Sequence, residues 1–580
     1  MTVPPAIRAW LHHWSLWLIP MGAVIGILAG AVVVLFRVGI AEAAHLFSGG
    51  LGFAGLPAWA RLLLPAAGGL GVGLLAQFAF PRHADVGVSR VLERVAYGAS
   101  QLGARSAFAQ FLFGTLAIGS GHSVGREGPS IHMGAAIGSL VGQRLGVDPD
   151  HLRILVAAGA AGAFAGALDI PLAGVVFALE VVLGEYSLLL FAPVVMSSVV
   201  ATVVTTQVTL GQAAFPTVPQ STVHDFWFLP LDVLIGLGAA FVSFLLLRGL
   251  EGIHHLGRRS RIPEWGLPAL GGLAVGALAV ASPAIMGVSY DAMARVFAAQ
   301  VPLVAMGGLL AAKLAATVLS LGTRARGGAI GPSLFMGALV GAIVAEAARE
   351  LIPWDPGTTA DYAVIGMAAG MAAILNAPFS AIVAVFELVQ SPAVILPVML
   401  ATVTAAVTSR NWFKAQSVFA WTLHLRELSE PALPEAGQKC TIPVNEVMVT
   451  EIRTLGPRIS PEELRTAQSE SGLQPVYPVV VNQELLGLVD LTGLLRAGLT
   501  DPGEDGRIDL TPYLHWAGDL RYLYPGDGLV KAMDLMASYG LAAYPVRSPR
   551  DARLLVGLVA QGPATRACME EIGTEDRTGA

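Results

Sequence analysis

Two apolar stretches of this 580-residue chain are interrupted by Gly-Pro elements, and each is followed by a second apolar element with a proline at its start. In the first half, GREGPSIHMGAAIGSLVG at 125–142 is followed by IPLAGVVFALE at 170–180. In the second half, GGAIGPSLFMGALVG at 327–341 is followed by APFSAIVAVFE at 377–387. Apolar segments broken by Gly and Pro at corresponding positions of two halves are typical of transporters whose site lies near the bilayer midplane. The repeat therefore predicts a membrane protein built from two related halves.

The composition supports a membrane protein. Hydrophobic residues make up 54% of the chain and charged residues 13%, with a mean hydropathy of +0.65, whereas soluble proteins carry about 25% charged residues. Several apolar segments have only about 12 to 16 residues, although a straight spanning helix needs about 20. Broken backbone at membrane depth survives only inside protein or beside a wet cavity. We therefore expect an all-α polytopic membrane protein with many short tilted or broken helices around an internal pathway.

The chain becomes polar after about residue 412. Two similar runs, YPV at 477–479 before GLV at 487–489 and YPV at 544–546 before GLV at 557–559, indicate a tandem α/β repeat in this soluble part. Both cysteines, Cys440 and Cys568, fall here, and we expect free thiols rather than a disulfide framework. We expect a transmembrane domain at 1–427 with repeats at roughly 60–210 and 228–412, a linker at 428–439, the α/β repeat at 440–570 and a disordered tail at 571–580. The net charge of −6 gives no support for a nucleic-acid partner.

The segment from Gly125 to Pro129 places Arg126 and Glu127 inside an apolar stretch. Each ionisable residue costs about 2.5–3.5 kcal/mol at the bilayer centre, so such residues mark functional positions. Glycine lets the backbone approach an ion, and proline suits the first turn of a helix. We expect Gly125, Arg126 and Gly128 to line an anion site. Glu127 is then a tethered anion that occupies the site when charged and leaves it when protonated; the alternative is a structural Arg126–Glu127 ion pair.

The second half repeats this helix start without a carboxylate, at Gly328 to Pro332. We expect the amides of Ala329 and Ile330 to complete an anion cradle, because helix N-termini attract negative charge. The alternative is a Gly-Pro kink that holds no ligand. Lys313 is a lone cation in an apolar segment and has two interpretations: it raises the potential near the pathway, or it pairs with a carboxylate.

GREGP, GGAIGPSLF and QSVFAWTLHLR at 416–426 together resemble the CLC family of chloride channels and transporters, over about residues 15 to 565. The resemblance implies inverted repeats, gating by Glu127, chloride or other small anions as substrate, and a homodimer with one pathway per subunit. It also implies a multi-pass protein of the cell (inner) membrane whose tail is a cytoplasmic pair of CBS domains. No enzyme activity, catalytic residue, metal or cofactor is expected. An adenine nucleotide at the CBS pair is the less favoured reading, because the family's Ser/Thr-x-x-Asp motif is poor around Thr492.

The departures from the family pattern bear on mechanism. Val86 stands where the family has an anion-binding serine, and Phe419 where it has a tyrosine, so two hydroxyl donors are missing from the expected site. Asp85 adjoins it, either adding negative charge or capping a helix in water. Val181 replaces the inner glutamate of proton-coupled members, which predicts channel-like or weakly proton-coupled transport, with a chloride/proton antiporter as the alternative.

Two further features have competing readings. Glu180 and Glu387 occupy matching places in the two repeats, and we interpret both as structural, capping or pairing inside the bundle. Ser120 and His122 suggest a remote alternative, an intramembrane hydrolase, which requires a Ser–His hydrogen bond and an oxyanion hole.

Overall fold

The computed structural model describes residues 17–97, 100–147, 149–184, 186, 188–210, 215, 226–351, 357–425, 442–469, 476–482, 484–489, 507–518, 520–539, 541–551, 553–564 and 567–568. The linker expected at 428–439, the tail expected at 571–580, Cys440 and Thr492 lie outside these residues. The chain divides into two compact units, Met1–Val95 with Ser100–Leu423, and Ala96–Ala99 with His424–Ala580.

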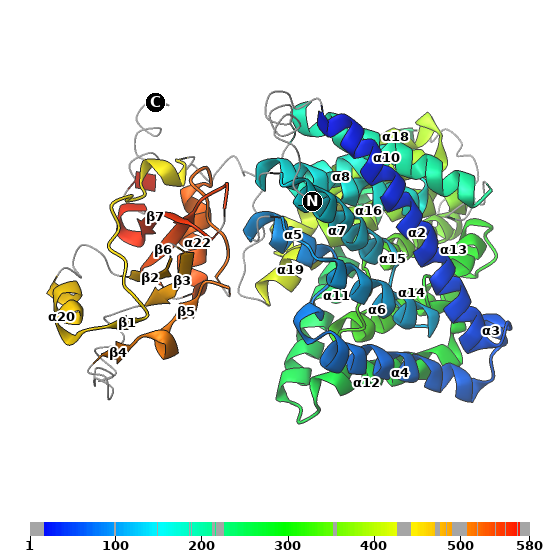
Figure 1. Cartoon of the computed structure of the whole chain (residues 1–580). Coiled ribbons are helices and arrows are strands. Elements are labelled where there is room, and N and C mark those ends of the chain that lie inside the picture. Colours follow the sequence, from blue (N-terminus) through cyan, green and yellow to red (C-terminus); the bar gives the residue numbers. More distant parts are fainter. Residues whose placement is uncertain are drawn as a thin grey trace. The chain divides into compact units, whose positions relative to one another are not determined.

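The first unit is helical (Figure 1). Its helices are α2 (Leu18–Ser48), α3 (Gly52–Gly55), α4 (Ala58–Leu74), α5 (Val88–Tyr97), α6 (Ala104–Gly119), α7 (Glu127–Leu145), α8 (Pro149–Leu168), α9 (Pro171–Phe177), α10 (Leu188–Val208), α11 (Leu229–Arg259), α12 (Leu267–Ala281), α13 (Tyr290–Phe297), α14 (Leu303–Gly322), α15 (Ile330–Leu351), α16 (Thr359–Leu375), α17 (Pro378–Val389), α18 (Ile395–Val407) and α19 (Val418–His424). Among the described residues, nine helical segments are long and apolar enough to cross a membrane. Three apolar helices are shorter: α16, α17, and α9 with its π-helical continuation η4 (Ala178–Leu183). The expected mixture of spanning and short helices is therefore present.

Two helix pairs repeat the same close crossing. α7 packs on α8, and α15 packs on α16. A Cβ placed on Gly134 of α7 would lie 2.2 Å from the carbonyl oxygen of Gly159, and one on Gly337 of α15 would lie 2.1 Å from that of Gly366. Small residues at helix interfaces allow backbones to approach closely without bulky side chains. The same glycine contact therefore fixes the same helix pair in each half.

The repeat begins earlier in the chain than residue 60, where the sequence pattern placed it. α2 packs against α6, α7, α8 and α10, and α11 packs against α14, α15, α16 and α18 in the corresponding way. α2 and α11 are therefore the first helices of the two halves, so the first half starts at Leu18. α4 of the first half and α12 of the second half pack side by side (Figure 1).

α9 and α17 exchange caps in an antiparallel arrangement. The carboxylate of Glu387, near the end of α17, accepts hydrogen bonds from the backbone amides of residues 172–173 at 2.8 and 2.7 Å. The carboxylate of Glu180, just after α9, accepts them from the amides of residues 379–380 at 3.0 and 2.7 Å, and from the Ser380 hydroxyl at 2.5 Å. Each glutamate thus satisfies the free amides of the partner helix's first turn. The structural, capping interpretation of both residues is confirmed.

The second unit contains short strands and helices. These elements are β1 (Arg458–Ile459), α20 (Pro461–Ser469), β2 (Tyr477–Val481), β3 (Glu484–Val489), β4 (Ile508–Asp509), β5 (His515–Trp516), α22 (Leu529–Tyr539), β6 (Ala543–Arg547) and β7 (Leu555–Ala560). The β2–β3 and β6–β7 hairpins are antiparallel, and each has one register shift near the end of its first strand. β5 extends the first hairpin, and β1 pairs with β4. The expectation of a free thiol at Cys568 is wrong, because its sulfur is in a disulfide.

Candidate functional site

The two Gly-Pro elements meet at a pair of backbone hydrogen bonds. The amide of Gly125 donates to the carbonyl oxygen of Gly328 at 2.7 Å, and the amide of Gly328 donates to that of Gly125 at 2.9 Å. A Cβ on Gly328 would lie 2.9 Å from the backbone nitrogen of Gly128, and one on Gly128 would lie 3.0 Å from the Cα of Gly328. The close approach of these two segments therefore requires glycine. It sets the starts of α7 and α15 side by side.

Glu127 begins α7, and its side chain is fully buried. Its Oε2 accepts a hydrogen bond from the backbone amide of Gly331 at 3.1 Å, in the first turn of α15. Its Oε1 accepts one from the hydroxyl of Tyr290. A carboxylate at a helix N-terminus is stabilised by the free amides and by the helix dipole. An anionic group thus occupies the start of α15, where the sequence predicts an anion cradle.

The amide that contacts this carboxylate belongs to Gly331 rather than to Ala329 or Ile330. The carbonyl oxygen of Ala329 accepts a hydrogen bond from the amide of Ser333 at 2.9 Å, and that of Ile330 accepts one from the Ser333 hydroxyl at 2.6 Å. Both residues are buried at the entry to α15. The Glu127 carboxylate is thus held by the first turn of α15, and the anion cradle expected at Ala329 and Ile330 stays a prediction.

Arg126 lies at the start of α7 with its guanidinium group directed at two neighbours. One nitrogen donates to the carbonyl oxygen of Ala167 at 3.3 Å. The guanidinium carbon lies 5.2 Å from the centroid of the Tyr290 ring. The cation therefore packs beside the tyrosine that contacts Glu127, and it contributes positive charge next to the carboxylate.

The loop that carries Val86 approaches the first Gly-Pro element. The ring nitrogen Nδ1 of His132, one turn into α7, lies 3.2 Å from the carbonyl oxygen of Gly87. A Cβ on Gly128 would lie 3.9 Å from the Val88 side chain. Val86 itself packs against an apolar cluster that includes Phe113. The loop therefore lies beside the start of α7, the Val86 side chain brings no hydroxyl to it, and a role for Val86 in anion binding stays a prediction.

Phe419 is buried at the start of α19, and its place in the expected site stays a prediction. Its exposed fraction is 6%. Trp421, two residues later, makes an edge contact with His254 of α11 at 6.3 Å between ring centroids.

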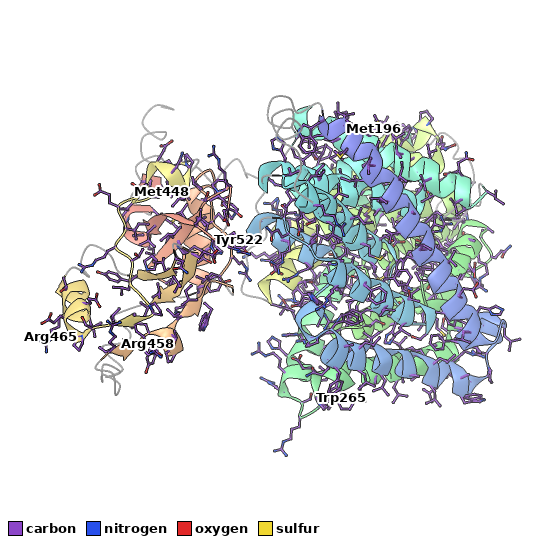
Figure 2. The ribbon with its side chains drawn as sticks, in the orientation of Figure 1. Met196, Trp265, Met448, Arg458, Arg465 and Tyr522 are labelled. Carbon is purple, nitrogen blue, oxygen red and sulfur yellow. The ribbon has the colours of Figure 1, made fainter. Side chains whose placement is uncertain are left out.

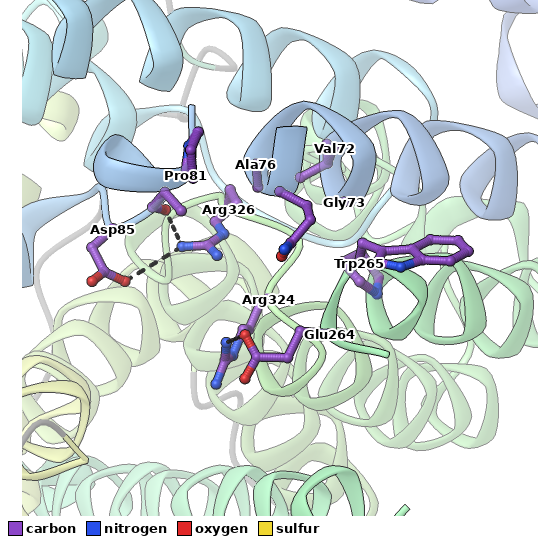
Figure 3. Close-up of a pocket in the computed structure, with 12 residues that line it drawn as sticks. Val72, Gly73, Ala76, Pro81, Asp85, Glu264, Trp265, Arg324 and Arg326 are labelled. Carbon is purple, nitrogen blue, oxygen red and sulfur yellow. Dashed lines mark hydrogen bonds and ion pairs between the residues drawn. The ribbon is translucent and has the colours of Figure 1, made fainter. Parts of the chain in front are cut away.

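A pocket of about 340 Å³ lies beside these segments (Figure 3). Its lining includes Asp85, the residue before Val86, and Arg326, two residues before Gly328. Asp85 Oδ1 lies 3.7 Å from a guanidinium nitrogen of Arg326, which also donates to the carbonyl oxygen of Ala84. Across the pocket, Arg324 pairs with Glu264 at 2.8 Å. Asp85 is 57% exposed, but an arginine faces it, so its negative charge beside the site is offset.

Among the described residues, Lys313 pairs with backbone carbonyl oxygens and a hydroxyl rather than with a carboxylate, and its effect on the potential near the pathway stays a prediction. It is fully buried, and its ammonium group donates to the carbonyl oxygens of Ile285 and Gly287 at 3.1 and 3.2 Å and to the Ser289 hydroxyl at 2.7 Å. These acceptors lie in the loop that leads into Tyr290. Sequence reasoning missed both the loop contact and Tyr290. A tyrosine at the start of a short amphipathic helix carries no charge or Gly-Pro signal that marks it.

The contacts of Ser120 and His122 do not favour a hydrolase. The Ser120 hydroxyl donates to the carbonyl oxygen of Ala117 at 3.1 Å. His122 Nδ1 lies 3.4 Å from the hydroxyl of Ser320, on α14. Each residue therefore has its own partner, whereas a nucleophile and its base must bond to each other.

Comparison with known proteins identifies the family. The family model described as voltage gated chloride channel matches residues 68–410. The putative chloride channel protein ClcB-like of Ralstonia nicotianae is 34% identical over 385 residues, which cover 66% of this chain and 89% of the relative. The chain belongs to the CLC family. It is thus a multi-pass membrane protein of a family that transports anions.

Solved CLC structures share the fold. A slow cyanobacterial Cl⁻/H⁺ antiporter matches with a TM-score of 0.64 at 22% identity, over 70% of this chain and 97% of its own. A eukaryotic CLC transporter matches with a TM-score of 0.63 at 20% identity, over 94% of this chain and 97% of its own. At these sequence identities, the likeness establishes that this chain has the CLC fold.

Proposed function

We propose that this CLC protein carries chloride or another small anion across the membrane through a site at the paired starts of α7 and α15. The observation that carries the proposal is the Glu127 carboxylate, bonded to the Gly331 amide at the N-terminus of α15. A side-chain anion there competes with a permeating anion for the same amides. Protonation neutralises Glu127 and weakens its hold, which opens the site.

We further propose that transport is channel-like or weakly proton-coupled. Val181 lies in η4, directly after the capping Glu180, and its side chain cannot bind or release a proton. The competing function is chloride/proton antiport, the activity of the solved cyanobacterial relative. An antiporter of this sequence would need a different inner proton acceptor.

Flux from reconstituted liposomes tests both proposals. Purified protein in vesicles loaded with chloride should release it when valinomycin and potassium dissipate the membrane potential. An imposed chloride gradient should drive little or no proton movement against the proton gradient. Reproducible uphill proton movement would establish antiport instead, and vesicles without anion flux would contradict the transport proposal itself.

We propose that the second unit is a cytoplasmic pair of CBS domains. Support comes from its two hairpins, each with the same YPV and GLV sequence and a register shift. The match to the eukaryotic CLC transporter covers 94% of the chain and therefore extends beyond the first unit. We propose a structural role for this pair rather than binding of an adenine nucleotide, and the expected ribose motif near Thr492 lies outside the described residues.

We propose that the protein is a homodimer in the cell (inner) membrane with one pathway per subunit. Support comes from family membership and from exposed apolar side chains on α9, α10, α17 and α18, where a second copy or lipid can pack. Figure 2 labels Met196 on α10 as one of them. Others are Leu172, Val203, Phe379, Met399 and Val407.

A further inference from the structure

Tyr290 reaches the gate from a segment that carries no Gly-Pro element. It is the first residue of α13, and its hydroxyl donates a hydrogen bond to Oε1 of Glu127. Its ring lies 5.1 Å from that of Phe215 at an interplanar angle of 61°, in an edge-to-face contact. The guanidinium of Arg126 lies against the same ring, 5.2 Å from its centroid. These contacts hold the ring so that the hydroxyl is directed at the carboxylate.

The loop before Tyr290, residues 285–289, is held by the buried ammonium group of Lys313. This group donates to two carbonyl oxygens of the loop at 3.1 and 3.2 Å and to Ser289 Oγ at 2.7 Å. Ser289 has a φ of 63°, a left-handed conformation that a residue with a side chain adopts only when its surroundings impose it. A buried charge is tolerated only when hydrogen bonds satisfy it. Lys313 therefore anchors a strained loop whose next residue touches the gate.

We propose that Tyr290 is a positioning residue that latches Glu127 in its closed position, and that Lys313 positions this latch through the 285–289 loop. The proposal rests on the proposed function, in which Glu127 blocks the anion site. A hydroxyl that donates to a carboxylate favours its charged form, which is the form that competes with the anion. Removing a hydrogen bond to a charged group shifts such an equilibrium by roughly tenfold or more.

The decisive experiment is a double-mutant cycle on chloride efflux from liposomes at one neutral pH. It compares the unmodified protein, Tyr290→Phe, Glu127→Gln and the double variant. Phenylalanine keeps the ring and its contacts and removes only the hydroxyl. We expect Tyr290→Phe to raise efflux about tenfold when Glu127 is present, because the carboxylate leaves the site more often. In the Glu127→Gln background the same change should have no effect, because no charged carboxylate remains to be latched.

The control is Tyr186→Phe, which removes the hydroxyl of an exposed tyrosine and should leave efflux unchanged. An equal change by Tyr290→Phe in both backgrounds would show that Tyr290 shapes the pathway without latching Glu127. No change in the unmodified background would also overturn the latch. Absence of efflux from every variant would overturn the proposed function and the latch with it, so the two failures are distinct.

Lys313→Met provides a second, independent test of the latch. It removes the three bonds to the 285–289 loop, so it should raise efflux with Glu127 present and leave Glu127→Gln unchanged. Ser289→Ala removes one of the three acceptors, and it tests the same link if Lys313→Met does not fold. An effect of Ser289→Ala that persists in the Glu127→Gln background would contradict the role assigned to the loop.

Discussion

Glu127 is a fully buried carboxylate in an apolar helix bundle, so its charge must be compensated locally. Its two oxygens receive the amide of Gly331 and the hydroxyl of Tyr290, and the guanidinium of Arg126 lies beside that tyrosine. The same hydrogen-bond donors and positive charge can bind either the carboxylate or a diffusible anion. The same chemistry that stabilises the glutamate therefore suits a permeating halide.

The first prediction concerns the pH dependence of transport. Anion efflux of the unmodified protein should rise as pH falls, because protonation neutralises Glu127 and frees the Gly331 amide. Glu127→Gln should give high efflux that varies little with pH, since glutamine mimics the protonated acid. Efflux assays across a pH series decide the point. If the variant keeps the original pH profile, Glu127 is not the gate.

The second prediction concerns selectivity. With valine at position 86, no side-chain hydroxyl from this loop reaches the anion, so backbone amides dominate and discrimination among chloride, bromide and nitrate should be shallow. Val86→Ser should sharpen the selectivity series or change anion affinity. Val86→Ala, which is as small as serine but has no hydroxyl, controls for lost packing against the apolar cluster around Phe113. An unchanged series in Val86→Ser would show that Val86 does not line the pathway.

At the scale of helices, corresponding helices of the two halves contact each other end to end in antiparallel fashion. α9 and α17 cap each other through Glu180 and Glu387, and α7 and α15 begin together at the Gly125–Gly328 bridge. Both contacts run antiparallel between the halves, as an inverted repeat requires. Short helices with buried N-termini are stable here because the opposite half supplies hydrogen-bond acceptors for their free backbone amides.

The third prediction tests these exchanged caps. Glu387→Gln should lower the free energy of unfolding by about 1–3 kcal/mol, because glutamine cannot satisfy two amides as a carboxylate does. Thermal unfolding in detergent is the measurement. Glu251→Gln is the control, since its ion pair with Arg248 lies on the surface and contributes little. Equal thermal stability of the two variants would show that the caps are not stabilising.

The sequence predicted the elements that repeat or that carry an unusual residue in an apolar context. Glu127, the two Gly-Pro helix starts and the paired glutamates all have such a signal. Tyr290 and the role of Lys313 do not, because their importance arises from a loop far away in sequence. The start of the first half at Leu18 was also missed, since α2 has no motif that matches α11. The engaged amide at Gly331 depends on helix geometry that spacing alone does not resolve.

At the scale of the whole molecule, the transport unit and the second unit are separate compact bodies. Each has its own buried core: the second unit packs residues such as Leu455, Tyr477 and Val489 together. Assembly can therefore involve either body, and the apolar outer surface of α10 and α18 offers the membrane part its own means of association.

The fourth prediction concerns assembly. Deleting all residues after Lys439 should leave a dimer in detergent, because we place the main contact between the membrane units. Mass measurement by light scattering, with the full chain as control, tests this. A truncated protein with the mass of a monomer would show that the second unit holds the dimer together.

The most direct test of the central claim is a density map of Glu127→Ala with bromide in place of chloride. The variant removes the carboxylate and leaves the Gly125–Gly328 bridge and the start of α15 intact. We predict a bromide peak, located by its anomalous signal, within hydrogen-bond distance of the Gly331 amide, where the carboxylate lies in the unmodified protein. A map in which bromide binds elsewhere while this position stays empty would contradict the account.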